Sequence, residues 1–148
     1  MTPALGNGAR TMVALGREEE ARALAAELLG QPKYARDWRI VELAWVARRL
    51  GCADEVRLSL EQATLHPRWI RVIEALIEER YEDAAEGFAE IGDLDSEAEA
   101  RLRAAEQLVA QGRRAEADAH LDQALAFFRS AGASRFVQQA ERLLAATA

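Results

Sequence analysis

Residues 112–128, GRRAEADAHLDQALAFF, contain three carboxylates and a histidine at close spacing, namely Glu116, Asp118, His120 and Asp122. Carboxylates beside a histidine can bind a metal ion or move a proton. On a helix, residues four apart share a face, so Glu116 and His120 face together. Asp118 and Asp122 form a second pair roughly 160° away. Because four ligands cannot converge from opposite faces, we expect no metal site here.

The apolar residues of the same stretch have the spacing of a helix side that faces a core. They are Ala117, Leu121, Ala124, Leu125 and Phe128. The acids then line the solvent, where they can pair with Arg113 or Arg114. The chain shows no other combination of nucleophile, base or metal ligands in a motif, so we expect no catalytic residue, no cofactor and no enzyme activity.

A second stretch, DWRIVELAWVARRLG at residues 37–51, carries two apolar stripes if it forms one regular helix. The natural core stripe comprises Ile40, Leu43, Ala44 and Ala47. The opposite side, within about 60°, comprises Trp38, Glu42, Trp45 and Arg49. Such a helix is either sandwiched in the fold or offers one stripe to a partner. Tryptophan and arginine are residue types that carry binding energy at interfaces.

Three residues of the helix expected at 67–79 occupy comparable positions in the repeat, namely Ile70, Arg71 and Glu74. Together the two helices would make an aromatic floor with charged edges, suited to an amphipathic helix or an extended acidic peptide. Two alternatives stay open. Both tryptophans of the first helix can pack on neighbouring helices, since large aromatic side chains bury much area. A closed pocket around Trp38 and Trp45 would instead indicate a small-ligand sensor.

The composition favours a single all-α domain over residues 1–148. Half of the 148 residues are apolar, and alanine and leucine, both strong helix formers, dominate. The net charge of −6 argues against a general nucleic-acid binder. No apolar run approaches the ~20 residues that cross a membrane. The single cysteine fits a reducing cytoplasm, where we expect the protein to be.

Glycines and prolines divide the chain into nine expected helices. Asp37 can cap one of them, and Ser96 with Glu99 has the spacing of a capping box at the start of another. The helices are expected at about 4–15, 17–29, 38–50, 53–64, 67–79, 82–91, 96–111, 114–131 and 134–146, with boundaries good to ~2–4 residues.

Four of these helices repeat one apolar pattern. A small or branched residue five places after a turn is followed by apolar residues four and seven places later. In chain order the four sets are Ala21, Ala25 and Leu28; Val56, Leu60 and Ala63; Ala84, Phe88 and Ile91; and Ala117, Leu121 and Ala124. We expect Ala21, Ala84 and Ala117 to be buried where paired helices approach closely.

This pattern resembles the tetratricopeptide repeat family, whose unit is a helical hairpin of about 34 residues. The glycine between paired helices matches at Gly16, Gly51 and Gly112, whereas the third copy reads Glu79-Arg80 instead. The resemblance implies a right-handed superhelix of about four antiparallel hairpins, closed by a C-terminal capping helix. It also implies a concave groove lined by the first helices of the hairpins.

Residues 113–146 look like the C-terminal ends of large bacterial signalling proteins, namely regulatory ATPases and nucleotide cyclases that carry helical repeats after their catalytic parts. Nothing in the chain matches those catalytic parts. The resemblance implies a protein-interaction or regulatory module of a larger signalling system. We therefore expect a protein or peptide partner, no nucleic acid and no membrane, and the oligomeric state is open.

Overall fold

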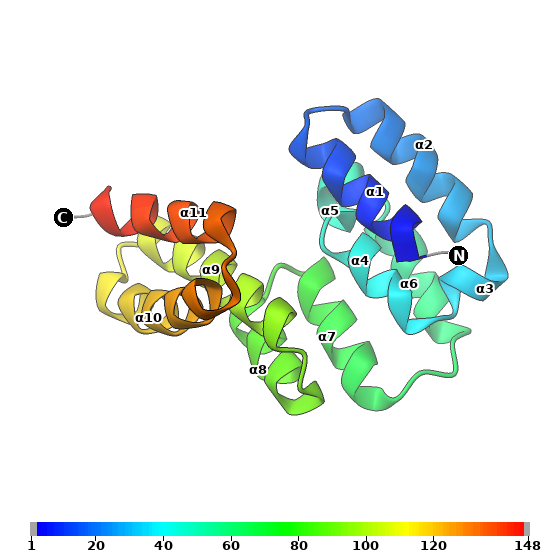
Figure 1. Ribbon diagram of the computed structural model, residues 1–148. Helices are drawn as coiled ribbons and strands as arrows, with labels where there is room; N and C mark the ends of the chain where they lie inside the picture. The colour runs from blue at the N-terminus through cyan, green and yellow to red at the C-terminus, as the bar shows by residue number, and fades with distance from the viewer. Residues whose placement is uncertain (1–2, 147–148) are drawn as a thin grey trace. The chain divides into compact units, whose positions relative to one another are not determined.

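The protein is helical throughout the part of the chain that the structure describes. The computed structural model describes the backbone of residues 3–146 and the side chains of residues 8–146. Its elements, drawn in Figure 1, are α1 (Pro3–Ala14), α2 (Glu18–Leu29), α3 (Pro32–Ala35), the 3₁₀ helix η1 (Trp38–Ile40), α4 (Val41–Ala44), α5 (Ala47–Leu50), α6 (Ala53–Glu61), α7 (Pro67–Ile77), α8 (Tyr81–Ile91), α9 (Leu94–Ala110), α10 (Arg114–Ala131) and α11 (Ser134–Ala145). No strand occurs within residues 3–146, so the expected all-α class is confirmed.

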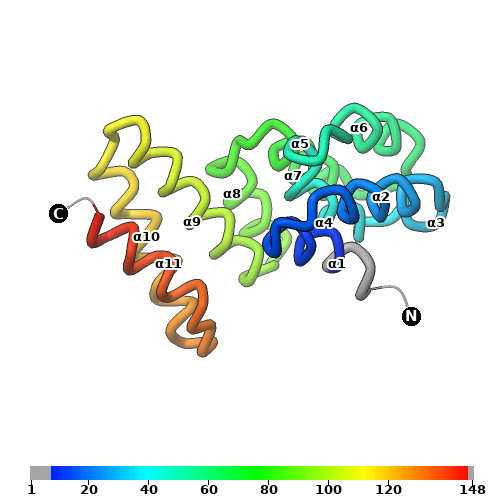
Figure 2. The backbone as a smooth tube through the Cα atoms, turned by 90° about the horizontal axis from the view of Figure 1, so that it is seen from above, coloured from blue at the N-terminus to red at the C-terminus, as the bar shows by residue number. Residues whose placement is uncertain are grey.

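The chain forms two compact units. Unit 1, Met1–Glu79, holds α1 to α7, and unit 2, Arg80–Ala148, holds α8 to α11. In unit 1, α1 packs on α2 and on α4, and α4 also packs on α7. In unit 2, α9 packs on α8 and α10, and α11 covers α10 and α9; Figures 1 and 2 show α10 and α11 side by side. That residues 1–148 form a single domain stays a prediction.

The predicted helix over residues 38–50 is wrong as one continuous element. The segment begins as the 3₁₀ helix η1, continues as α4 and restarts as α5 after Val46, whose φ of −121° and ψ of 2° leave the helical region. The extra short helix α3 precedes it. The predicted core stripe is nevertheless confirmed, because Ile40, Leu43, Ala44 and Ala47 are all buried. Val41 and Leu50 are buried as well.

Glycine turns close several of the longer helices, as the sequence predicted. Gly51 and Gly112 have φ values of 73° and 75°, a left-handed conformation that glycine adopts at little cost. After Gly112, the Arg113 N–H donates to the Leu108 carbonyl at 2.8 Å, which satisfies a carbonyl at the helix end. The turn of the third copy has the same form without glycine, because Glu79 itself adopts a φ of 55°.

Side-chain caps define two helix starts near the positions that the sequence indicated. The Asp37 carboxylate accepts from the Arg39 N–H at 3.0 Å, so its predicted capping role is confirmed at the start of η1. The capping box predicted at Ser96 is misplaced. There Asp93 is the cap and accepts from the Ser96 N–H at 3.1 Å, so α9 begins at Leu94.

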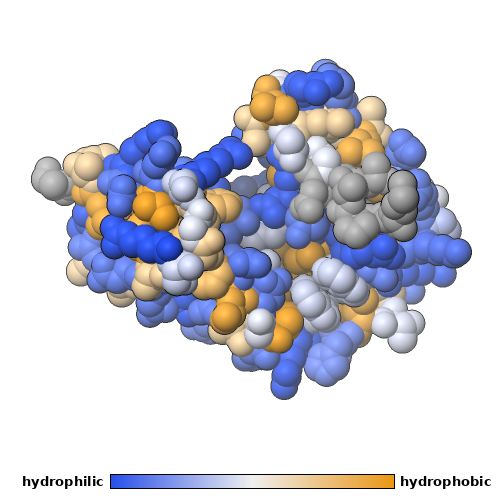
Figure 3. Space-filling view, viewed as in Figure 1, coloured by the Kyte–Doolittle hydropathy of each residue, from blue (hydrophilic) through white to orange (hydrophobic). Residues whose placement is uncertain are grey.

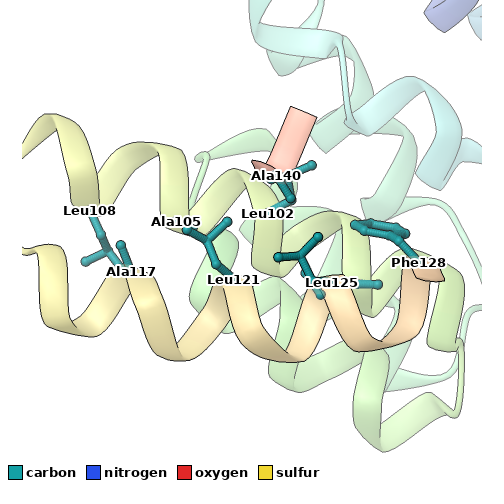
Figure 4. Packing of buried hydrophobic residues seen from close by; sticks show 10 residues of the cluster. Leu102, Ala105, Leu108, Ala117, Leu121, Leu125, Phe128 and Ala140 are labelled. Atoms are coloured by element: carbon teal, nitrogen blue, oxygen red, sulfur yellow. The ribbon is translucent and has the colours of Figure 1, made fainter. Parts of the chain in front are cut away.

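The first two positions of the repeated apolar pattern are buried in all four copies. Ala21, Ala84 and Ala117 are fully inaccessible, as expected, and so is Val56. The second residues of the sets are buried too, whereas Ala63 and Ile91 in the third positions are only half-buried. The core of unit 2, in which Ala117 meets α9, is drawn in Figure 4 and comprises Ala98, Leu102, Ala105, Leu108, Ala117, Leu121, Ala124, Leu125, Phe128 and Ala140.

Candidate functional site

The exposed Trp38 pairs with the partly buried Trp69. The two ring centroids lie 5.4 Å apart with their planes tilted by 34°. Trp38 stands at the start of η1 and Trp69 in the first turn of α7, so the contact joins two helix starts of unit 1. Trp38 remains 49% exposed, which is unusual for so large an apolar side chain.

Local hydrogen bonds fix the backbone that presents Trp38. The Asp37 carboxylate, besides capping η1, accepts from Arg39 Nε at 2.7 Å. Burial alone would raise the pKa of Asp37, but the hydrogen bonds from Arg39 outweigh it and hold this pKa below its usual range. The buried Tyr34 donates its hydroxyl proton to the Arg39 carbonyl at 3.2 Å. Burial, with the Glu42 charge adding to it, raises the pKa of Tyr34 to about 12.

Trp45 and Glu42 face α1 rather than Trp38. The Arg10 guanidinium lies 4.9 Å from the centre of the Trp45 ring, within the range of a cation–π interaction. The same guanidinium pairs with the Glu42 carboxylate at 2.9 Å, where both side chains are about a quarter exposed. Arg10 therefore ties α1 to α4 through a ring and a carboxylate. Arg10, Glu42 and Trp45 thus pack against one another inside unit 1.

The remaining predicted site residues lie on two other helices. Arg49, on α5, pairs with Glu18 of α2 at 2.7 Å. On α7, Ile70 is half-buried, and Arg71 and Glu74 are exposed. None of the seven predicted residues is fully buried, so each keeps some contact with solvent.

The sequence predicted that Trp38 and Trp45 lie on one surface, provided that residues 38–50 form one regular helix. The structure has no such helix. A 3₁₀ segment has three residues per turn instead of 3.6, which changes the direction of Trp38 relative to Trp45, and the break at Val46 does the same for Arg49. Trp38 pairs with Trp69, and Trp45 with Arg10. Binding of a partner by these residues stays a prediction.

Sequence reasoning missed Trp69 as the neighbour of Trp38. Helical spacing cannot reveal it, because Trp69 belongs to another helix. The usable signal was local: Pro67 starts α7 and places Trp69 in its first turn, next to the capped segment at Asp37. The face seen in Figure 3 shows that each unit exposes mostly hydrophilic side chains, interrupted by small hydrophobic groups.

The acid-rich stretch of α10 is mainly a charged helix surface. Arg113 Nε donates to Glu116 at 2.8 Å and Arg114 Nε donates to Asp118 at 2.7 Å, so the predicted pairing is confirmed. The hydrogen bond from Arg113 lowers the pKa of Glu116. Within residues 8–146, no three side chains of His, Cys, Asp or Glu gather in a way that could hold a metal ion.

His120 differs from the acids around it. Its side chain is only 19% exposed and links α10 to two other helices of unit 2. Its Nε2 lies 3.2 Å from the Glu82 carboxylate on α8, and its Nδ1 lies 3.4 Å from the Arg101 guanidinium on α9. Arg101 in turn pairs with Glu97 at 2.7 Å. This set of side chains joins α8, α9 and α10.

Cys52 is half-buried at the start of α6. Burial raises the pKa of its thiol, and the nearby Glu55 charge raises it further. A raised pKa keeps the sulfur protonated, which is the opposite of what a reactive thiolate requires.

No protein-family model, curated protein or solved structure matches this chain. Among the helices of residues 3–146, none combines the length and apolar character needed to cross a membrane. The candidate site is therefore defined by its own residues, chiefly the half-exposed Trp38 in contact with the partly buried Trp69.

Proposed function

We propose that the chain is a cytoplasmic helical-repeat module that binds a protein or peptide partner, with Trp38 and Trp69 at the centre of the contact. The observation that carries this proposal is the indole pair, with Trp38 half-exposed, held on capped helix starts. An indole positioned in advance supplies contact area at little entropic cost, which is how tryptophan serves binding surfaces.

The repeat part of the proposal is a tetratricopeptide-like superhelix of helical hairpins acting as a regulatory module of a larger signalling system. This part is supported by a local structure that recurs four times along the chain. Four copies bury a small or branched residue at the same place after a turn, and the turn keeps its left-handed residue even where glycine is replaced by Glu79. Repeats of this kind commonly present extended binding surfaces.

Selection from a displayed library of random linear peptides tests the proposal, because no partner needs to be known in advance. We expect the wild-type chain to enrich a set of peptides, and we expect Trp38→Ala to weaken their binding by at least about tenfold, the size of an interface hot spot. Fluorescence anisotropy of the enriched peptides gives the affinities.

The matched control is Leu58→Ala on α6. Leu58 is 56% exposed, so this change also removes an exposed apolar side chain from unit 1, and it lies on neither of the helices that carry the tryptophan pair. Leu58→Ala should leave the affinities unchanged. Failure to enrich any peptide, or equal losses in the two variants, would refute a binding role for Trp38.

A further inference from the structure

We infer that His120 is a pH-dependent link between helices of unit 2. In its neutral form the ring joins α10 to both α8 and α9, and in its protonated form it keeps α8 and loses α9. The inference goes beyond the proposed function, because it concerns unit 2 and needs no partner. Three observations support it: the hydrogen-bonding partners of the ring, the fixed position of Arg101, and the other charges that face the ring.

The two ring nitrogens of His120 face partners of opposite kinds. Nδ1 lies 3.4 Å from an amino group of the Arg101 guanidinium, and Nε2 lies 3.2 Å from the Glu82 carboxylate. A guanidinium can only donate hydrogen bonds, and an ionised carboxylate can only accept them. Nδ1 must therefore be the unprotonated acceptor, and Nε2 must carry the proton. Only the neutral ring with its proton on Nε2 satisfies both contacts.

Arg101 is held in place by a second partner on its own helix. Its Nε and its other amino group both donate to one oxygen of Glu97, at 3.0 and 2.7 Å. The side chains of Arg101 and Glu97 are only 17% and 18% exposed. The guanidinium consequently cannot turn away from the ring without breaking these bonds. A proton on Nδ1 would set two cations against each other, which turns an attractive contact between α9 and α10 into a repulsive one.

Carboxylates on the other sides of the ring attract the protonated form. Glu82 would form an ion pair with the imidazolium across the contact that is already in place. Glu116 precedes His120 by one turn of α10, close enough for the two charges to interact, and its carboxylate is held by Arg113. On α8, Glu86 follows Glu82 by one turn and is exposed. Protonation therefore moves the bonding of His120 from α9 toward α8.

The other histidine of the chain can be removed without losing its local role. His66 is exposed at the N-cap of α7 in unit 1, where its Nδ1 accepts from the Arg68 N–H at 3.2 Å. Asparagine is a strong N-cap acceptor and has no charge to titrate. His66→Asn therefore leaves His120 as the one imidazole of the chain.

The first test determines which nitrogen carries the proton. Long-range hydrogen–nitrogen NMR spectra of the isotope-labelled wild-type chain, recorded at about pH 8, should show His120 protonated at Nε2 and unprotonated at Nδ1. The spectrum of His66→Asn assigns the signals, since it contains one histidine. A proton on Nδ1 at this pH, whether in the other tautomer or in the imidazolium, would overturn the inference.

The second test measures the coupling between His120 and Arg101 by a double-mutant cycle in the His66→Asn background. His120→Ala and Arg101→Met are made singly and together, and urea unfolding gives the stability of each at about pH 8 and about pH 5. At the higher pH, the double variant should lose less stability than the sum of the two single losses. At the lower pH this difference should vanish or change sign, because the protonated ring gains nothing from Arg101.

A matched cycle combines His120→Ala with Glu82→Gln in the same background. Its coupling should persist at the lower pH, because the imidazolium and the carboxylate then form a charge-assisted hydrogen bond. Circular dichroism confirms that each variant is folded. Coupling between His120 and Arg101 that is equal at the two pH values would contradict the inference. Loss of coupling in both cycles would contradict it as well, since acid would then loosen unit 2 as a whole instead of releasing α9.

Discussion

Ala117 offers a direct test of the helix packing in unit 2. Its side chain is fully inaccessible, and Figure 4 shows it on α10 directed at Leu108 of α9. Ala119, two residues later on the same helix, is exposed. The variants Ala117→Glu and Ala119→Glu therefore make one chemical change on one helix, in the core and at the surface respectively.

The expected magnitudes follow from this burial. At Ala119 the change costs only the difference in helix propensity, about 0.5 kcal/mol or less. At Ala117 the longer side chain must be forced into a packed interface, which costs about 1–3 kcal/mol. Its carboxylate would also enter the core without a partner. We expect Ala117→Glu to lower the free energy of unfolding by about 3–5 kcal/mol in total.

Urea denaturation followed by circular dichroism measures both values, and thermal melting should show a loss of at least about 12 °C for Ala117→Glu. The pH dependence gives a second check. A buried carboxyl has a raised pKa in the folded state, so its penalty is full at pH 7 and shrinks as the pH falls toward the unfolded value of about 4.3. The difference in free energy of unfolding between Ala117→Glu and Ala119→Glu should therefore become smaller at low pH.

Equal stability of the two glutamate variants would refute this packing, because it would place Ala117 outside the α9–α10 interface. Ala117→Leu separates crowding from charge. It should be destabilising by the crowding cost alone and should show no pH-dependent recovery.

Three further outcomes are expected. Glu79→Gly should raise the free energy of unfolding by about 0.5–1 kcal/mol, because glycine adopts the left-handed conformation of this residue without strain. In the same urea titration, the neighbouring Glu78→Gly should lower the free energy of unfolding. The neutral Tyr34 phenol stabilises the fold below the unfolded pKa near 10, so wild type should lose stability between pH ~10 and ~12, and Tyr34→Phe should not show this loss. His120→Ala should cost about 1 kcal/mol more than Asp122→Ala by thermal melting, because His120 bonds to two other helices.

Local chemistry made much of the fold predictable. Gly51 and Gly112 were identifiable as helix ends because a left-handed residue closes a helix with little strain when it is glycine. Ala21, Ala84 and Ala117 were identifiable as core residues from their spacing. Apolar residues that recur every three or four positions lie on one side of a helix, and that side is the one that packs against the core. The arginine partners of Glu116 and Asp118 followed from the same periodicity.

The candidate site was only partly predictable, because its parts come from separate elements. Trp38 and Trp45 were found by residue type, but their assignment to one surface assumed an unbroken helix. The segment is instead a 3₁₀ turn followed by two short helices, with the break at Val46. Likewise, His120 was grouped with surface acids, since no local pattern predicts contact with Glu82, 38 residues away.

The sequence by itself determined the helical class, most helix ends and the buried side of each long helix. These depend on interactions between residues that are close along the chain. Only the tertiary structure decided that Trp38 meets Trp69 and that Arg10 covers Trp45. Such contacts depend on how whole helices pack, and packing is settled by the sum of many buried contacts rather than by any local motif.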